Sequence, residues 1–321
     1  MSSYEQYDHD LFRNVKKSKA RKPKSAKRQR FDDEPVRRGR LTEEERDRLA
    51  ALRDEPEPQP LPGGADRWST WDTGDRGPQP HPSWLVTELA ALDHELGVLK
   101  TGKEADVHLL RRAVPGGDSC LLAAKRYRDT DHRMFHRDAG YLEGRRLRKS
   151  REMRAIEHRT SFGRGMIAQQ WAVAEFSVLS ALWLTGAPVP YPVQRVGTEV
   201  LLEFIGTPDG TAAPRLAALR PDADELDELW SQLVEALIAL AEHGFTHGDL
   251  SAYNVLVHDG RLVLIDLPQA VDLAANPLGL DYLRRDAHNI AGWFRSRGAD
   301  EARTDPDLLA ERLATAGNLR W

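Results

Sequence analysis

The chain has 321 residues, with 46 basic and 50 acidic side chains and a net charge of −4. This length suits one large domain or two of ordinary size and excludes a small disulfide-stapled scaffold. The single cysteine, Cys120, excludes an internal disulfide and a cysteine metal cluster, so we expect a reducing compartment. The sequence contains no apolar stretch of membrane-spanning length and no signal-peptide pattern. We therefore expect a cytoplasmic protein with no membrane contact.

The N-terminal residues 1–53 are basic, with 16 Lys or Arg against 10 Asp or Glu. Residues 11–30 alone hold ten basic side chains and no acidic one, which predicts a disordered arm. Such an arm could bind RNA phosphates or serve only as a solubilising tail, and both readings stay open. Residues 54–82 hold seven prolines and four glycines and are predicted to form a linker.

The ordered part is predicted to begin at Ser83, which could cap a helix carrying Leu85, Leu89 and Leu92. Residues 98–112 and 120–127 are predicted strands, joined in a hairpin by a Pro-Gly-Gly turn.

Two helices are predicted after a charged insertion. The insertion, residues 129–165, has no clear period and is predicted to be a loop. Residues 167–184 and 226–241 show helical apolar spacing, and residues 200–205 between them read as a strand.

The most informative stretch runs from Thr246 to Asp266. Asp259-Gly260 lies between two β-rich runs, and this dipeptide predicts a tight hairpin turn. Counting back from the turn places Asn254 and Asp266 as neighbours at the open end, with Asp249 on the loop that enters it. Two carboxylates and an amide oxygen are ligands that suit Mg²⁺ with a bound nucleotide, although Asp and Asn are also common turn formers.

Two charged residues are anomalous in their predicted elements. Lys125 ends an apolar strand, and Glu175 lies on the apolar stripe of the helix over residues 167–184. Each could be an edge residue that reaches solvent. A pair between them resolves both anomalies and matches the lysine–glutamate ion pair of protein kinases.

At this point the chain resembles the RIO family of atypical protein kinases, most nearly its type-one branch. Five blocks in kinase order, within residues 96–294, carry the resemblance. They are Lys100-Thr101-Gly102-Lys103-Glu104-Ala105-Asp106-Val107, similar to the phosphate loop S-T-G-K-E-A-x-V; Ala124-Lys125-Arg126-Tyr127; residues 171–176 with Glu175; the hinge-like Leu202-Glu203-Phe204-Ile205-Gly206; and residues 247–254 with 265–271.

Some positions distinguish this chain from ordinary protein kinases. Ser251 stands where those enzymes carry Lys or Arg, and Pro268 replaces the glycine of the usual metal loop. No Ala-Pro-Glu activation segment follows Asp266 in the sequence. The resemblance therefore implies an α+β, two-lobed kinase-like fold with no conventional activation segment. We expect a sheet and a helix in an N-lobe, residues 83–206, and mainly helices in a C-lobe, residues 207–321.

The resemblance also implies roles for the site residues. Thr101, Gly102 and Lys103 would cover the phosphates of ATP. Lys125, fixed by Glu175, would hold the inner phosphates, and the main chain of Glu203 and Ile205 would bind adenine. Asn254 and Asp266 would bind Mg²⁺, with Mn²⁺ as an alternative, and Asp249 would act as the base that orients the attacking hydroxyl or water.

Three functional classes follow from these features. The first is a kinase that phosphorylates itself or protein serine and threonine. The second is an ATPase switch, or a non-catalytic nucleotide-dependent factor, that binds ribosomal RNA or a ribosomal particle through the basic arm. The third is a small-molecule phosphotransferase of the aminoglycoside or choline type, because His-Gly-Asp-Leu also occurs there. Salt-sensitive RNA binding by residues 1–53 alone would favour the second class.

Overall fold

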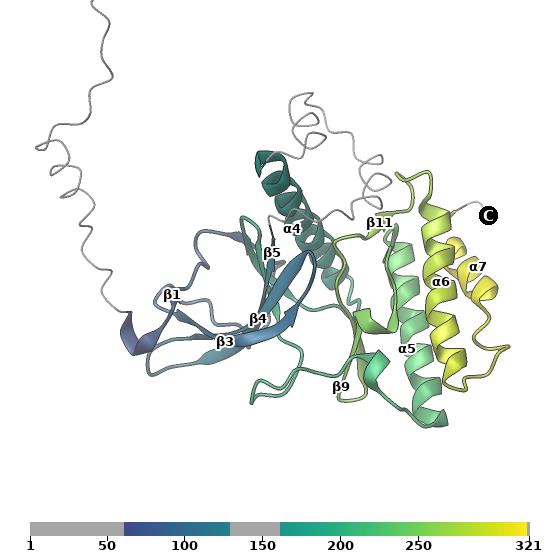
Figure 1. The fold of residues 1–321 in the computed structure, drawn as a ribbon, viewed down its shortest axis with the longest axis horizontal. Coiled ribbons are helices and arrows are strands. Elements are labelled where there is room, and N and C mark those ends of the chain that lie inside the picture. Colours follow the sequence, from purple (N-terminus) through teal and green to yellow (C-terminus); the bar gives the residue numbers. More distant parts are fainter. Residues whose placement is uncertain (1–60, 129–160, 320–321) are drawn as a thin grey trace, which may run out of the picture. The chain divides into compact units, whose positions relative to one another are not determined.

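The structure is a computed structural model of the chain, and it describes residues 61–128 and 161–319. An antiparallel sheet has seven strands in the order β1-β3-β4-β5-β7-β6-β2. The strands are β1 (Arg67–Trp68), β2 (Asp75–Arg76), β3 (Leu92–Thr101), β4 (Ala105–Ala113), β5 (Ser119–Tyr127), β6 (Pro192–Val196) and β7 (Glu199–Glu203). Helix α4 (Ser161–Leu184) lies beside this sheet and contacts β5, β6 and β7 (Figure 1).

The second half of the described chain is mainly helical. Figure 1 shows α5 (Ala223–Glu242), α6 (Gly279–Ser296) and α7 (Pro306–Ala316) running side by side. The smaller elements are β8 (Phe245–Thr246) paired with β11 (Val271–Asp272), β9 (Val255–His258) paired with β10 (Arg261–Leu264), and the 3-10 turns η1 (Pro62–Gly64), η2 (Leu216–Ala218) and η3 (Ala252–Asn254). The predicted α+β kinase-like fold is confirmed, while the lobe boundary at residues 206 and 207 stays a prediction.

The first two long strands meet at the glycine turn of the predicted phosphate loop. The segment 98–112, predicted as a single strand, contains the end of β3, a turn at residues 102–104, and most of β4. Gly102 donates its N–H to the Ala105 carbonyl at 2.9 Å, and a Cβ at Gly102 would lie 2.9 Å from that oxygen. A side chain here would force the backbone to shift, so the turn favours glycine, as the predicted phosphate loop implies, although the strand predicted over residues 98–112 ran through it. The hairpin predicted at the Pro-Gly-Gly turn is confirmed between β4 and β5, with Ala113 opposite Ser119.

Both long predicted helices are confirmed. The side chains of Trp171, Val178 and Leu182 on α4 are buried, and the chain turns at Gly186, whose φ is 80°. Helix α4 begins six residues before the predicted start. Helix α5 begins with the Asp222 carboxylate accepting from the Glu225 N–H at 2.9 Å, a cap that satisfies a backbone donor of the first turn.

Residues 61–91 differ from the sequence expectation. The predicted helix at Ser83 is wrong, because residues 83–91 form turns and extended chain that lead into β3. Leu85 and Val86 are buried next to each other while Leu89 is exposed, which does not match the burial of one helical face. Strands β1 and β2 both lie within the segment predicted as a linker, so the sheet begins before Ser83.

Several predictions concern parts outside the described residues. The basic arm, residues 1–53, and residues 129–160 of the charged insertion are among them. Within the described ranges, no helix combines the length and apolar character needed to cross a bilayer. Cys120 is buried in the core of the sheet, as its sequence context predicts.

Candidate active site

Lys125 lies between two carboxylates. Its Nζ is 2.6 Å from Glu175 Oε1 and 2.7 Å from Asp266 Oδ1. Lys125 comes from β5 and Glu175 from the fully buried face of α4, so the ion pair inferred from two sequence anomalies is formed. The contact with Asp266 was not predicted from the sequence, which assigned that carboxylate to a metal ion. Three elements far apart in the chain thus meet at one ammonium group.

Mutual attraction keeps Lys125 and Asp266 ionised despite their burial. Burial alone would lower the pKa of the Lys125 ammonium, but Asp266 and Glu175 outweigh it and raise this pKa well above its usual range. The Lys125 charge lowers the pKa of the Asp266 carboxyl far below its usual range, against the effect of burial. Tyr127 donates its hydroxyl to Glu175 Oε2 at 2.5 Å, and burial together with Glu175 raises the pKa of this hydroxyl. Tyr127 is therefore a neutral donor that holds Glu175 in place.

Asp266 is presented by a backbone turn directly after β10. Its φ of 68° lies in the left-handed region, which Asp adopts more readily than most residues. Its Oδ1 bonds Lys125, and its Oδ2 faces the Lys100 Nζ at 3.8 Å. The side chain keeps 32% of its surface exposed, so the carboxylate is open on one side.

The hairpin of β9 and β10 brings Asn254 to the same end. The predicted register is confirmed, with His258 opposite Arg261 and positive φ at both turn residues, Asp259 and Gly260. Ile265 donates its N–H to the Asn254 carbonyl at 3.0 Å, which places Asn254 next to the strand end that leads into Asp266. Asn254 Nδ2 donates to the Asp249 carbonyl at 2.9 Å, so its amide oxygen remains as the possible metal ligand.

The loop that carries Asp249 is held by a buried residue whose role sequence reasoning missed. Asp286 of α6 accepts from the Thr246 hydroxyl at 2.9 Å, from the Gly248 N–H at 2.7 Å and from the Leu250 N–H at 3.0 Å. Because one carboxylate accepts from the N–H groups of Gly248 and Leu250, it fixes the path of the loop on both sides of Asp249. The signal available in the sequence was an acidic residue on the apolar face of a helix, the same kind of anomaly that revealed Glu175.

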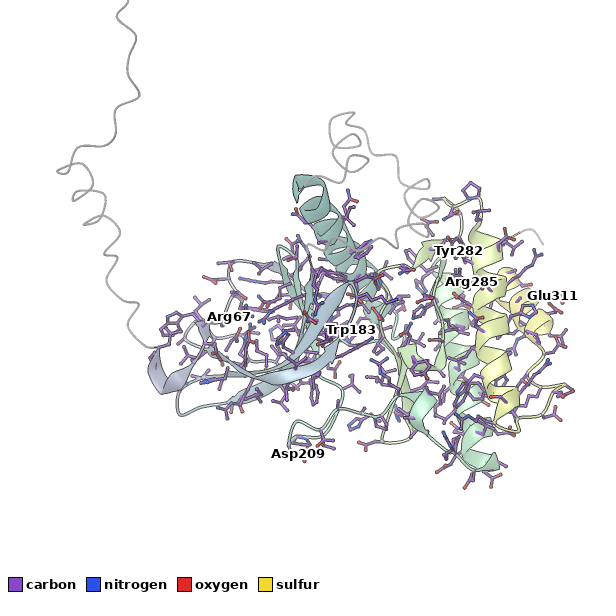
Figure 2. All side chains as sticks on the ribbon, viewed as in Figure 1. Arg67, Trp183, Asp209, Tyr282, Arg285 and Glu311 are labelled. Carbon is purple, nitrogen blue, oxygen red and sulfur yellow. The ribbon has the colours of Figure 1, made fainter. Side chains whose placement is uncertain are left out.

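Gly248 occupies a position that admits no side chain. Its φ is 82°, and an added Cβ would lie 2.1 Å from the Gln269 carbonyl. Arg285, labelled with Tyr282 on α6 in Figure 2, donates to the Gly248 carbonyl, and its guanidinium lies 4.8 Å from the Tyr282 ring centre. The His247 ring bonds the Ile265 carbonyl and accepts from the Asp249 N–H, and so helps to fix the loop.

A pocket of about 430 Å³ opens next to the Lys125 pair. Its apolar lining comes from the sheet and from the β9–β10 hairpin, and its polar lining is charged. The apolar side chains include Leu99, Val107, Ala123, Leu202, Phe204, Ile205, Leu256 and Ile265, and the charged ones include Lys100, Lys103, Lys125, Glu175, Glu203 and Asp266. A pocket that combines an apolar lining with several lysines suits a nucleotide, whose base is apolar and whose phosphates are anionic.

The hinge-like segment offers main-chain groups at the apolar end of this pocket. Glu203 donates its N–H to the Tyr191 carbonyl at 2.9 Å, so its carbonyl is the group that could accept from a base. Ile205 accepts from the Ala213 N–H at 3.0 Å, so its own N–H is the group that could donate. The Glu203 carboxylate accepts from the Tyr191 N–H at 2.9 Å, and burial raises the pKa of this carboxyl.

The structure brings most of the predicted site residues together. Gly102, Lys103, Lys125, Glu175, Glu203, Ile205 and Asp266 all line the pocket. Among the described site residues, Thr101, Asp249 and Asn254 are not part of the lining. Thr101 lies opposite Asp106 in the β3–β4 register, and Asp249 is exposed on its loop. Asp249 and Asn254 thus lie outside the pocket lining, in the segment that leads into β9.

Comparisons with known proteins agree with this arrangement. The sequence pattern of the RIO domain matches residues 122–307. The RIO-type serine/threonine-protein kinase Rio1 of Haloferax volcanii is 35% identical over 216 residues, which are 67% of each chain. Serine/threonine-protein kinase RIO1 of Caenorhabditis elegans is 33% identical over 219 residues, which are 68% of this chain and 39% of that protein. The chain thus spans well under half the length of this nematode relative.

Among solved structures, the Rio2 kinase of Chaetomium thermophilum is similar, with 23% identity and a TM-score of 0.45 over 69% of this chain and 67% of that one. The match to the RIO domain covers more than half of the 321 residues and includes Lys125, Glu175 and Asp266. The chain belongs to the RIO family of atypical serine/threonine protein kinases.

Proposed function

We propose that the chain is an ATP- and Mg²⁺-dependent kinase that transfers the γ-phosphate of ATP to serine or threonine of a protein, including itself. The observation that carries the proposal is the Lys125 ammonium, held by Glu175 and Asp266 at the charged end of an apolar pocket. Such a lysine meets phosphates, and a carboxylate next to it meets the metal ion that accompanies them.

The residues present fit a magnesium–nucleotide complex. Mg²⁺ prefers hard oxygen ligands and takes few of them from the protein, because phosphates and water complete its shell. Asp266 supplies a half-open carboxylate, and Asn254 supplies an amide oxygen at the same strand ends. When bound, Mg²⁺ would neutralise negative charge on the phosphates. Gly102 and Lys103 would cover these phosphates from the turn between β3 and β4.

Asp249 would orient the acceptor hydroxyl and take up its proton. The hydroxyl oxygen then forms a bond to the γ-phosphorus, and the bond from that phosphorus to the oxygen shared with the β-phosphate breaks, which releases ADP. Asp286 accepts from the N–H groups of the residues on either side of Asp249, and Asn254 donates to the Asp249 carbonyl, so the exposed carboxylate can work from a fixed position.

One observation favours water as a second acceptor. Residues 267–278 connect Asp266 to α6. This segment is short for a surface on which a peptide substrate docks. We therefore include ATP hydrolysis in the proposal, with a ribosomal particle as the partner released by it. The small-molecule phosphotransferase is the weaker alternative, because the family is one of protein kinases.

Incubation of the full chain with γ-labelled ATP and Mg²⁺ tests the proposal. We expect label on serine or threonine, or release of labelled phosphate, and a fall of about 100-fold or more in Asp249→Asn and Asp266→Asn. Asp118→Asn, an exposed acid in the turn between β4 and β5, is the matched control and should keep full activity. Equal rates in wild type and Asp249→Asn would contradict the proposal, and phosphate release without protein label would identify an ATPase.

A further inference from the structure

Lys100 is a further cation in the lining of the pocket, beside Lys103 and Lys125, and none of the roles above uses it. It stands directly before Thr101, where the family pattern quoted above has serine. Its Nζ lies 3.8 Å from Asp266 Oδ2, and the residue lines the pocket. The chain therefore carries an extra positive charge next to the carboxylate proposed to hold Mg²⁺.

An irregularity in β3 directs this lysine into the pocket. Successive side chains of a regular strand point to opposite faces of the sheet. The register between β3 and β4 shifts between Val98 and Lys100, and both Leu99 and Lys100 line the pocket. A bulge of this kind turns a side chain that would otherwise point away from the site.

The two lysines differ in depth and in charge balance. The Lys125 side chain is 9% exposed and its charge is matched by the buried Glu175, whereas the Lys100 side chain is 40% exposed. Asp266 lies between them, with Oδ1 towards Lys125 and Oδ2 towards Lys100. A nucleotide whose base fills the apolar slot extends its phosphates towards the open side. The deeper Lys125 would then meet the inner phosphates, and the more exposed Lys100 would meet the outermost one.

We propose that Lys100 binds the terminal phosphate of the nucleotide and makes the site prefer a triphosphate over a diphosphate. This inference rests on the proposed nucleotide site and adds how many phosphates the preferred nucleotide carries. The triphosphate carries one more negative charge than the diphosphate, and Lys100, the more exposed of the two lysines beside Asp266, is placed to meet it.

Calorimetric titration of the full chain tests this role, with the Mg²⁺ complexes of ADP and of a non-hydrolysable ATP analogue. Lys100→Met removes the ammonium and keeps the aliphatic stem, and Lys100→Ser restores the family pattern. We expect both variants to bind the ATP analogue about tenfold more weakly and to change ADP binding by less than about twofold. Lys100→Arg should retain the preference. Arg111→Ser, which removes an exposed cation of β4 outside the pocket lining, should bind both nucleotides as wild type does.

The outcomes separate this inference from the proposed function. If wild type binds neither nucleotide, the nucleotide site itself is wrong and the role of Lys100 falls with it. If wild type binds both and the Lys100 variants weaken both by the same factor, or neither, the nucleotide site stands and the inference is overturned. A thermal melt of each variant, together with two different replacements at one position, distinguishes lost binding from lost folding.

Discussion

The charged residues of the site are arranged so that each buried charge has a partner. Lys125 lies in a buried strand and Glu175 on a buried helical face, and either one alone would carry the cost of removing an unpaired charge from water. Their pairing at 2.6 Å removes that cost and fixes the ammonium. Asp266, which is partly open to solvent, can exchange its bond with Lys125 for another ligand at lower cost. The Lys125–Glu175 pair is therefore suited to holding a fixed position, and the open Asp266 carboxylate is suited to exchanging one ligand for another.

The buried Glu203 carboxyl is expected to make the stability of the protein depend on pH. Burial raises the pKa of this carboxyl above its ordinary value of 4.5, although the Tyr191 N–H opposes the effect. The native state therefore holds the proton at a pH where the unfolded chain has lost it. This contribution favours the native state below the ordinary pKa and is lost as the pH rises through the raised one.

Glu203→Gln removes the charge and keeps an oxygen that can accept from Tyr191. We expect the free energy of unfolding at neutral pH to increase by about 1 kcal/mol or less, and this gain to vanish towards about pH 4. Urea unfolding of both proteins between about pH 4 and pH 8 measures it. A difference that stays constant across this range would mean that the Glu203 carboxyl does not titrate differently in the two states.

At the scale of elements, α6 supports the loop that carries Asp249. Asp286 satisfies the N–H groups of Gly248 and Leu250, and Arg285 contacts the Gly248 carbonyl. The loop has little freedom as a result, because the backbone on each side of Asp249 is bonded to one helix. Helix α6 contributes no residue to the pocket lining, which comes mainly from the sheet, the segment after β7 and the β9–β10 hairpin.

Asp286→Ala should therefore affect turnover more than nucleotide binding. It leaves the Gly248 and Leu250 N–H groups without their acceptor, which should lower the free energy of unfolding by about 2 to 4 kcal/mol. We expect kcat for phosphate transfer to fall much further than the affinity for ATP. Thr246→Val is the matched control, because it removes one hydroxyl donor and should cost about 1 kcal/mol. Equal losses of kcat in the two variants would show that Asp286 is not the main support of the loop.

The elements also show what the sequence could predict and what it could not. The Asp259-Gly260 hairpin was predictable because local turn geometry sets its register. The Lys125–Glu175 pair was predictable because each residue contradicted the pattern of its own element. Asp286 also contradicted the apolar pattern of its helix, but two of its three partners are backbone N–H groups, which a sequence pattern cannot reveal. The helix expected at Ser83 failed because apolar spacing over nine residues fits a turn and a strand start equally well.

At the scale of the whole described chain, residues 61–91 complete the sheet. Strand β1 pairs with β3 on one edge and β2 pairs with β6 on the other. Arg112, fully buried, donates to Asp93 at 2.7 Å and to Gln194 at 2.9 Å, and Gln194 donates to the Thr70 hydroxyl at 2.6 Å. Composition predicted a linker here because two-residue strands among prolines and glycines have no periodic signal. The segment is tied to the sheet by hydrogen bonds and buried side chains.

The last prediction tests whether this segment stabilises the protein. Trp71 is 6% exposed and packs in one cluster with Leu85, Leu110 and Tyr191. In the full chain, Trp71→Ala should lower the free energy of unfolding by about 3 to 5 kcal/mol, because it empties a large space in that cluster. Trp68→Ala is the matched control, since Trp68 is 49% exposed, and it should cost less than about 1 kcal/mol. Urea unfolding followed by circular dichroism gives both values without relying on the altered fluorescence. A linker would tolerate either change, so equal and small losses would mean that residues 61–91 do not stabilise the sheet.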